Sequence, residues 1–203
     1  MHLIFNHPKI NNKKEEKGLS LIESAMVLAL AATVTAGVMF YYQSASDSNK
    51  TQSAISEVMS ATSAINGLYI GQNGYNGLNA GVLKNSSAIP ENYKKGDEIM
   101  NPFGGKLEVG TPTAGTANAA FGYYIHLTGL PKSACISLAT LNLGTSAAGY
   151  GIGVTTPGSV ASLGGSLGNN TGKKEPISPS EAANSSSQGC SDGNDNKVTY
   201  FIK

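Results

Sequence analysis

The chain contains no arginine and no tryptophan, and only 13% of its 203 residues are charged. Lysines and acidic residues nearly balance, which gives a formal net charge of +1. Nucleic-acid binding needs a clustered basic surface that neutralises phosphates, and arginine is usually part of that surface. A polynucleotide-binding protein is therefore disfavoured, and we expect no nucleic acid among the partners.

Groups suited to catalysis are equally scarce. Beyond residue 18 there is one histidine, His126, which we expect as a half-exposed residue on a strand. The hexapeptide Ser-Asp-Gly-Asn-Asp-Asn at 191–196 resembles an oxygen-rich calcium loop, but it lacks the distal bidentate glutamate, so a turn is favoured. Gly164-Gly165 has no strand-to-helix context and no phosphate-binding lysine pattern. We expect neither an enzyme nor a metal or cofactor site.

Proline is absent between Pro8 and Pro90, which leaves a long stretch without a helix-breaking residue. Within it, Leu19–Tyr42 is predominantly apolar and Glu23 is its only charge. These 24 residues would form a helix of roughly 36 Å, compared with about 30 Å for the hydrocarbon core of a bilayer. The run is therefore predicted to span a membrane.

The same helix is expected to continue beyond the span. Residues 43–70 have an amphipathic pattern, with side chains at spacings of three and four. They are Ile55, Val58, Met59, Thr62, Ile65, Leu68 and Tyr69. We expect one continuous helix, Leu19–Tyr69, whose second half buries one face against its own domain.

Charge at the N-terminus predicts the orientation of the span. Residues 1–18 carry four lysines and two glutamates, whereas residues 19–203 carry ten lysines and eleven acidic residues. The positive-inside rule then keeps the N-terminus cytoplasmic and exports the C-terminal domain. An ordinary secretory signal has its small residues after the apolar run, whereas here Gly18 precedes it. Cleavage after Gly18 would remove a leader and keep the span; an uncleaved signal anchor is the alternative.

Cysteine is limited to Cys135 and Cys190. An oxidising compartment favours joining them into a disulfide, and two free structural thiols are the alternative. Closing a loop of this size contributes on the order of 3–4 kcal/mol in the chain-entropy model. The predicted disulfide therefore bounds a loop, 135–190, within the exported domain.

Beyond Gly71 the pattern changes from helix to strands and turns. Phe121, Tyr123, Ile125 and Leu127 alternate and should share one face of a strand. Strands are expected at 106–109, 120–127, 150–155 and 197–203, with short helices at 133–143 and after the N-cap Ser178. The prediction is an α+β fold, in which the long helix packs on an antiparallel sheet of a head domain, 71–203.

The N-terminal sequence resembles that of a known family. Lys17-Gly18-Leu19-Ser20-Leu21-Ile22-Glu23-Ser24 is similar to the class III leader junction of type IV pilins, and Leu19 at its first mature position is typical of the IVb branch. The likeness extends over most of the chain, through 101–105, 120–124, 136–151 and 197–203. It implies the major structural subunit of a type IVb pilus, which polymerises through its N-terminal helix into surface fibres for adhesion, bundling and auto-aggregation. It also implies that the C-terminal strand lies inside the sheet.

The resemblance assigns roles to three residues. A prepilin peptidase in the inner membrane would cleave between Gly18 and Leu19 and would N-methylate the amine of Leu19. Glu23 would pair with that amine on a neighbouring subunit, which gives an isolated carboxylate in hydrocarbon a partner. A protonated or snorkelling acid near the membrane surface is the alternative.

The same resemblance implies partners and location. The partners are other pilin subunits in a homopolymer, the peptidase and the pilus assembly machinery, first in the inner membrane and then in an extracellular pilus of a Gram-negative bacterium. Within the disulfide-bounded loop, residues 155–189 would be solvated and would either mediate contacts between fibres or form an inert spacer. A minor pilin or a pseudopilin of a type II secretion-like machine is the alternative function.

Overall fold

A computed structural model describes residues 20–113, 120–168 and 170–203. The chain divides into two compact units, Met1–Gln43 and Ser44–Lys203. Helix α1, Leu21–Leu68, is 48 residues long and contributes to both units. The expected helix had nearly the same bounds, and its first residue, Leu19, lies outside the described part of the chain.

Within the first unit, threonine hydroxyls of α1 donate hydrogen bonds to carbonyls of the preceding turn of the same helix. The hydroxyl of Thr33 donates to the carbonyl of Ala29 at 3.2 Å, and that of Thr35 donates to the carbonyl of Ala31 at 2.7 Å. Such bonds to the preceding turn pair hydroxyls that would otherwise be costly in an apolar environment. Threonine is therefore compatible with an apolar helix surface here.

In the second unit, α1 buries a face that differs from the predicted one. Its buried residues are Ala54, Glu57, Val58, Ala61 and Ile65. The predicted stripe was wrong for Met59 and Leu68, which are 55% and 47% exposed. Ala54 and Ala61, which carried no weight in a pattern of large apolar residues, are fully buried.

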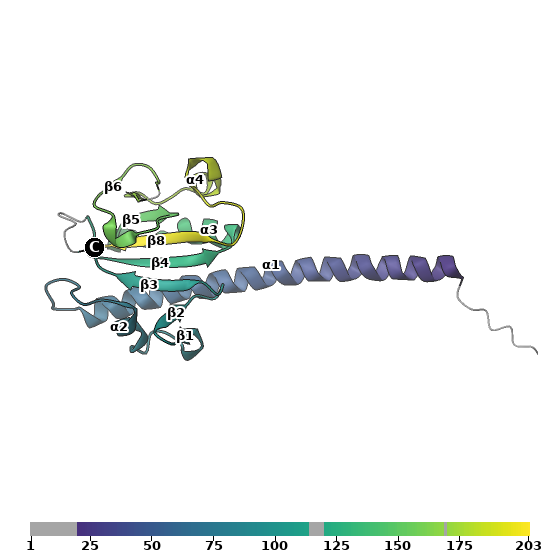
Figure 1. Cartoon of the computed structure of the whole chain (residues 1–203), viewed down its shortest axis with the longest axis horizontal. Helices are drawn as coiled ribbons and strands as arrows, with labels where there is room; N and C mark the ends of the chain where they lie inside the picture. The colour runs from purple at the N-terminus through teal and green to yellow at the C-terminus, as the bar shows by residue number, and fades with distance from the viewer. Residues whose placement is uncertain (1–19, 114–119, 169) are drawn as a thin grey trace, which may run out of the picture. The chain divides into compact units, whose positions relative to one another are not determined.

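Eight strands form one sheet within the described residues, in the order β1-β2-β3-β4-β8-β5-β7-β6 (Figure 1). All neighbours are antiparallel except β6 and β7. The strands are β1 (Lys94–Lys95), β2 (Glu98–Met100), β3 (Lys106–Gly110), β4 (Tyr123–Leu130), β5 (Ala147–Ile152), β6 (Leu163–Gly164), β7 (Gly172–Lys173) and β8 (Asn196–Ile202). The prediction that the C-terminal strand lies inside the sheet is confirmed, since β8 pairs with both β4 and β5.

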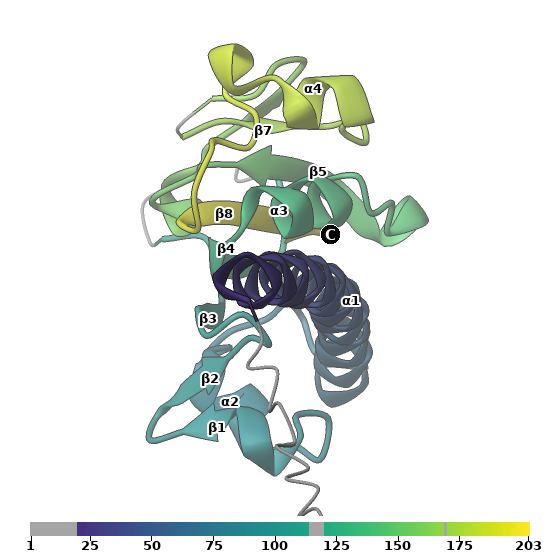
Figure 2. The same cartoon turned by 90° about the vertical axis from the view of Figure 1, so that its right-hand side faces the viewer.

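One face of the sheet carries the main core and is covered by α1 and by α3 (Lys132–Ala139), as Figure 2 shows. Ile125 of β4 lies directly opposite Tyr200 of β8 in the register. The Tyr200 hydroxyl donates to the carbonyl of Leu138 in α3 at 2.6 Å, and the Tyr123 hydroxyl donates to Asn66 of α1 at 3.1 Å. Two buried tyrosines therefore fix both helices to this face.

The opposite face has a smaller core around Phe201. Its buried members are Phe121, Val154, Val160, Leu163 and Phe201. Phe121 was predicted to share a face with Tyr123, and that prediction was wrong. It precedes the first residue of β4, so strand alternation does not apply to it, and its ring centroid lies 4.8 Å from that of Phe201.

The prediction for His126 was also wrong. It is 2% exposed rather than half-exposed, and its Nδ1 lies 2.8 Å from Oγ1 of Thr199, its cross-strand neighbour on β8. Burial, with a smaller effect from Lys197, lowers the pKa of His126 from 6.5 to about 4. The imidazole is therefore neutral at physiological pH and belongs to the interior of the head.

Short helices connect the strands. Helix α2 (Ala80–Lys84) begins after Asn79, whose side chain accepts from the amide of Val82. Helix α4 (Pro179–Ala183) begins at the predicted N-cap Ser178. Single 3₁₀ turns lie at Glu91–Tyr93, Gly144–Ser146, Pro157–Ser159 and Ser185–Ser187.

Candidate functional site

The first half of α1 presents an apolar surface. Every large apolar side chain between Leu21 and Tyr42 is at least 60% exposed. Among the described residues, α1 is the one helix that is long and apolar enough to cross a membrane. A continuous exposed apolar surface of this kind marks a membrane or protein interaction site. The predicted span at 19–42 coincides with it, apart from Leu19, whose placement is not described.

Glu23 lies in the first turn of this helix and is exposed. Its Oε2 accepts a hydrogen bond from the backbone amide of Ser20 at 3.0 Å, which forms one half of a capping box. An acidic side chain at this end also complements the positive end of the helix dipole. The structure thus places the lone carboxylate of the span beside the start of the helix. The predicted cleavage residues, Gly18 and Leu19, lie outside the described residues.

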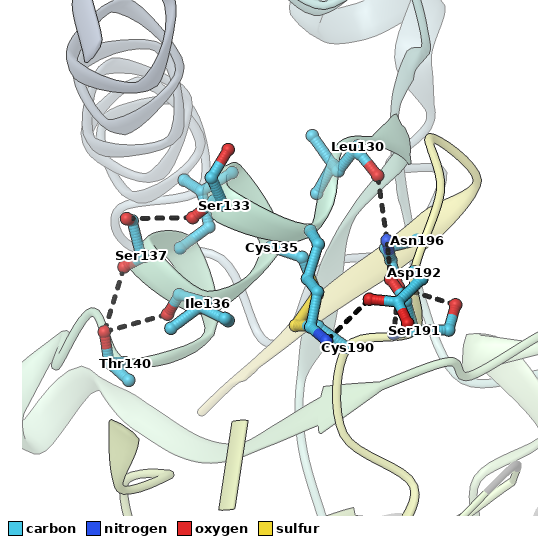
Figure 3. Close-up of a disulfide and its surroundings, with 12 residues drawn as sticks. Leu130, Ser133, Cys135, Ile136, Ser137, Thr140, Cys190, Ser191, Asp192 and Asn196 are labelled. Atoms are coloured by element: carbon cyan, nitrogen blue, oxygen red, sulfur yellow. Dashed lines mark hydrogen bonds and ion pairs between the residues drawn. A yellow bond between two sulfur atoms is a disulfide. The ribbon is translucent and has the colours of Figure 1, made fainter. Parts of the chain in front are cut away.

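The two cysteines are joined, as predicted. Cys135 of α3 and Cys190 are both fully buried, and their Cα atoms are 6.0 Å apart. Figure 3 shows the bridge beside the segment that leads into β8. The backbone amide of Cys190 also donates to the carbonyl of Ala182 at 2.7 Å, so the end of the loop is held both covalently and by a backbone bond.

The side chain of Asn196 forms the hydrogen bonds that hold the bend between the loop and β8 (Figure 3). Its Oδ1 accepts from the amide of Ser191 at 2.7 Å and from the Ser191 hydroxyl at 3.1 Å. Its Nδ2 donates to the carbonyls of Leu130 at 3.1 Å and Ser191 at 3.0 Å. The segment is therefore a bend closed by one buried amide, as the turn prediction for 191–196 required. Asp192 pairs with Lys132 at 2.7 Å, which lowers its pKa.

The loop between the cysteines is more structured than its composition suggested. Lys173 of β7 is 8% exposed, and its Nζ donates to Glu181 Oε1 at 2.7 Å and Oε2 at 2.9 Å. Glu181 also completes a capping box with Ser178. The Lys173 hydrogen bond, followed by those from Ser178, lowers the pKa of Glu181 to about 2. The segment 155–189 is only partly the solvated surface that was expected, because many of its residues are exposed while interior contacts bury others.

Comparison with known proteins decides the family. The family model described as Bundlin matches residues 43–203. The chain belongs to the bundlin family. Two relatives, from Escherichia coli O111:H- and from Escherichia coli O127:H6 (strain E2348/69 / EPEC), are each named "Major structural subunit of bundle-forming pilus". Each is 63% identical over 197 residues, which cover 96% of this chain and 98% of the relative.

A solved structure supports the fold independently. The crystal structure of a type IV b pilin from Salmonella typhi superposes with a TM-score of 0.54 and covers 77% of this chain and 99% of that one. The sequence identity is 17%, so this likeness concerns the fold alone. The α+β prediction is confirmed, and this member of the bundlin family has a long helix packed on a mostly antiparallel sheet.

One charged residue of this bundlin-family head was missed by sequence reasoning. Glu57 of α1 is 4% exposed, and neither carboxylate oxygen has a hydrogen-bond partner among the described residues. Burial raises its pKa from 4.5 to about 8. A signal was available, because Glu57 lies three residues after Ala54 and four before Ala61, on the face that α1 buries.

Proposed function

We propose that this chain is the major structural subunit of a bundle-forming type IVb pilus, and that it polymerises through the first half of α1. The observation that carries the proposal is the exposed apolar surface from Leu21 to Tyr42, with Glu23 as its only charge. Packing against the same segment of other subunits removes that surface from water. Relatives that match almost the whole chain carry the corresponding name.

Before assembly the same segment anchors the subunit in the inner membrane. The proposed leader ends at Gly18, and a prepilin peptidase cleaves there and N-methylates the new terminus at Leu19. Glycine suits this position because any side chain would hinder close approach of the peptidase to the backbone. The assembly machinery then moves the anchored subunit into the extracellular fibre.

Glu23 is the proposed assembly residue. A carboxylate in hydrocarbon costs roughly 2.5–3.5 kcal/mol on insertion scales, so it needs a partner. Cleavage creates an ammonium group at Leu19, and the same group on a neighbouring subunit neutralises Glu23. The position of Glu23 in the first helical turn, exposed and bonded through Oε2 to Ser20, supports this role because the carboxylate lies where a neighbour's terminus can approach.

The test is a comparison of Glu23→Ala with Glu175→Ala, which removes an exposed carboxylate from the head. Both variants should be cleaved, as mass spectrometry of the mature N-terminus will show. Immunoblots of sheared filaments should show at least a tenfold loss of fibre for Glu23→Ala and no loss for Glu175→Ala. Normal piliation by Glu23→Ala would refute the assembly role. Sheared filaments in which the wild-type chain is a trace component would instead favour a minor pilin or pseudopilin.

The disulfide-bounded loop is the proposed surface for bundling and adhesion. Its interior is fixed by the Cys135–Cys190 bridge and the Lys173–Glu181 pair, while Thr155, Thr156 and many of its other polar side chains are exposed. Such a scaffold presents polar groups on a rigid base, which is the usual arrangement for recognition by loops.

A further inference from the structure

A groove lined by serines lies along the second half of α1, within the head unit. It consists of two adjoining cavities of about 610 and 240 Å³, which share Ser56, Ser60 and Ala88 as lining residues. We call this region the serine groove. Its smaller cavity is completed by Ser53, Glu57, Pro90 and Tyr93. Small hydroxyl side chains on the helix leave room for an incoming polar group, and they offer it hydrogen-bond acceptors.

Glu57 is the one acidic side chain that lines the smaller cavity. Its two oxygens provide about four acceptor sites, and none of them is used within the described chain. Buried acidic groups in proteins are normally paired or hydrogen-bonded, because an unpaired one costs free energy. A carboxyl in this state therefore points to a cationic partner from outside the head.

Charges near the cavity do not supply that partner. The walls come from α1 and from the segment 88–93, where Tyr93 is the other titratable lining residue. The adjacent lysine, Lys94, is paired with Glu91 at 2.6 Å. Burial is the sole cause that shifts the Glu57 pKa, so no neighbouring charge acts on it appreciably.

We propose that the serine groove receives a lysine ammonium from a neighbouring copy of this chain in the fibre, and that this ammonium pairs with Glu57. The inference rests on the proposed function, since the fibre brings copies together. Lysine is the available cation because the chain has no arginine, His126 is buried and the proposed ammonium at Leu19 is assigned to Glu23. Of the ten lysines beyond residue 18, five are in ion pairs in the described structure. The remaining candidates are Lys50, Lys95, Lys174, Lys197 and Lys203.

Formation of the proposed Glu57–lysine pair should make the association of subunits depend on pH. In the separate subunit Glu57 is largely protonated at neutral pH, because its pKa is raised to about 8. Pairing with an ammonium group ionises it, so association releases up to one proton per subunit below that pH. Association should then strengthen by up to about tenfold per pH unit.

If Glu57 stays unpaired, pH acts on the stability of the head in the opposite direction. Its folded pKa, about 8, exceeds the ordinary value of 4.5, so the free energy of unfolding of the head falls as pH rises between those values. Without a partner for Glu57, the head would therefore unfold more readily as pH rises, while dissociation of folded subunits would not become harder.

The experiment uses fibres sheared from cells that produce the full chain. Fibres are incubated in mild detergent at pH 5.5 to 8, and released subunits are measured after ultracentrifugation. Wild-type fibres and fibres of Glu108→Gln, which removes an exposed carboxylate outside the loop, should release less subunit as pH rises, whereas Glu57→Gln fibres should show a flattened response. An unchanged slope in Glu57→Gln, or a wild-type slope of opposite sign, would overturn the proposal.

Lysine variants keep the test decisive if Glu57→Gln yields no fibres. Each of the five candidate lysines is replaced singly by glutamine. One of these variants should flatten the pH response as Glu57→Gln is expected to do, and absence of any such lysine would overturn the proposal. A lack of wild-type fibres containing this chain would instead overturn the proposed function, so the two failures are distinguishable.

Discussion

Replacement of Asn196 by aspartate changes one atom in the most connected side chain of the disulfide region. Asn196 is 6% exposed, and its Nδ2 donates to the carbonyls of Leu130 and Ser191 and, at 3.4 Å, to that of Gly193. In Asn196→Asp these donations are lost, and a carboxylate oxygen is placed against the same carbonyls. The acceptance from the Ser191 amide at 2.7 Å can persist, so the shape of the bend is retained while its hydrogen bonding is not.

The magnitude follows from two buried groups left without a donor, the Leu130 carbonyl and the carboxylate oxygen that replaces Nδ2, since Ser191 is exposed and its carbonyl can bond to water. Each buried group without a partner costs about 1–3 kcal/mol, so a loss of about 2–4 kcal/mol is expected at neutral pH. The protonated form of the introduced carboxyl can donate to one carbonyl, which raises its pKa above the ordinary value of about 3.9. Because a raised acidic pKa stabilises the folded state at low pH, the deficit relative to wild type should shrink as pH falls toward that value.

Thermal unfolding of the full chain in detergent micelles, followed by near-ultraviolet circular dichroism, measures this effect. The expected fall in Tm at pH 7 is roughly 4–16 °C, at about 2–4 °C per kcal/mol for a chain of this size. Asn194→Asp is the matched control, because Asn194 is an exposed residue of the same bend. A deficit below about 1 kcal/mol, or one that does not change with pH, would refute the role assigned to Asn196.

Two further predictions concern the stability of the head. Replacing Cys135 and Cys190 together by serine should lower the free energy of unfolding by about 4 kcal/mol in the chain-entropy model; denaturant titration checks this, with reduced wild type as the control. For His126, the folded pKa of about 4 lies below the ordinary value of 6.5. Protonation therefore favours the unfolded chain, and up to about 3 kcal/mol of stability should be lost as pH falls from 6.5 toward 4. His126→Gln should flatten this pH dependence, and an equal dependence in the variant would contradict the assignment.

The long helix and several strands could be predicted from the sequence where the local patterns were strong. The stretch without proline predicted α1, and alternation predicted β3, β4 and β8 to within a few residues. The N-cap of α4 was legible because Ser178 is followed by proline. These signals are encoded in neighbouring residues, so a single sequence suffices to read them.

The missed features depend on partners distant in sequence. Strands β6 and β7 have two residues each and form through pairing with each other and of β7 with β5. The burial of His126 depends on Thr199 opposite it. Glu57 looked like an ordinary polar helix residue, and only the close packing around Ala54 and Ala61 makes it buried. The spacing of Glu57 from Ala54 and Ala61 becomes informative only once the buried face of α1 is known.

Substitutions in the connection between β5 and β8 should be tolerated differently from substitutions in the central strands and α1. Ile152 of β5 lies opposite Val198 of β8, so the long connection between these strands starts and ends at adjacent points of the sheet, to which it also contributes β6 and β7. Lengthening such a connection costs free energy only logarithmically, and the bridge at Cys190 isolates the return strand from what precedes it. The exposed positions between residues 153 and 189 can therefore diversify, whereas β6, β7 and the buried Val154, Val160 and Leu163 in the same stretch must be kept for the sheet and its smaller core. Such changes would leave the exposed apolar surface from Leu21 to Tyr42 unaltered.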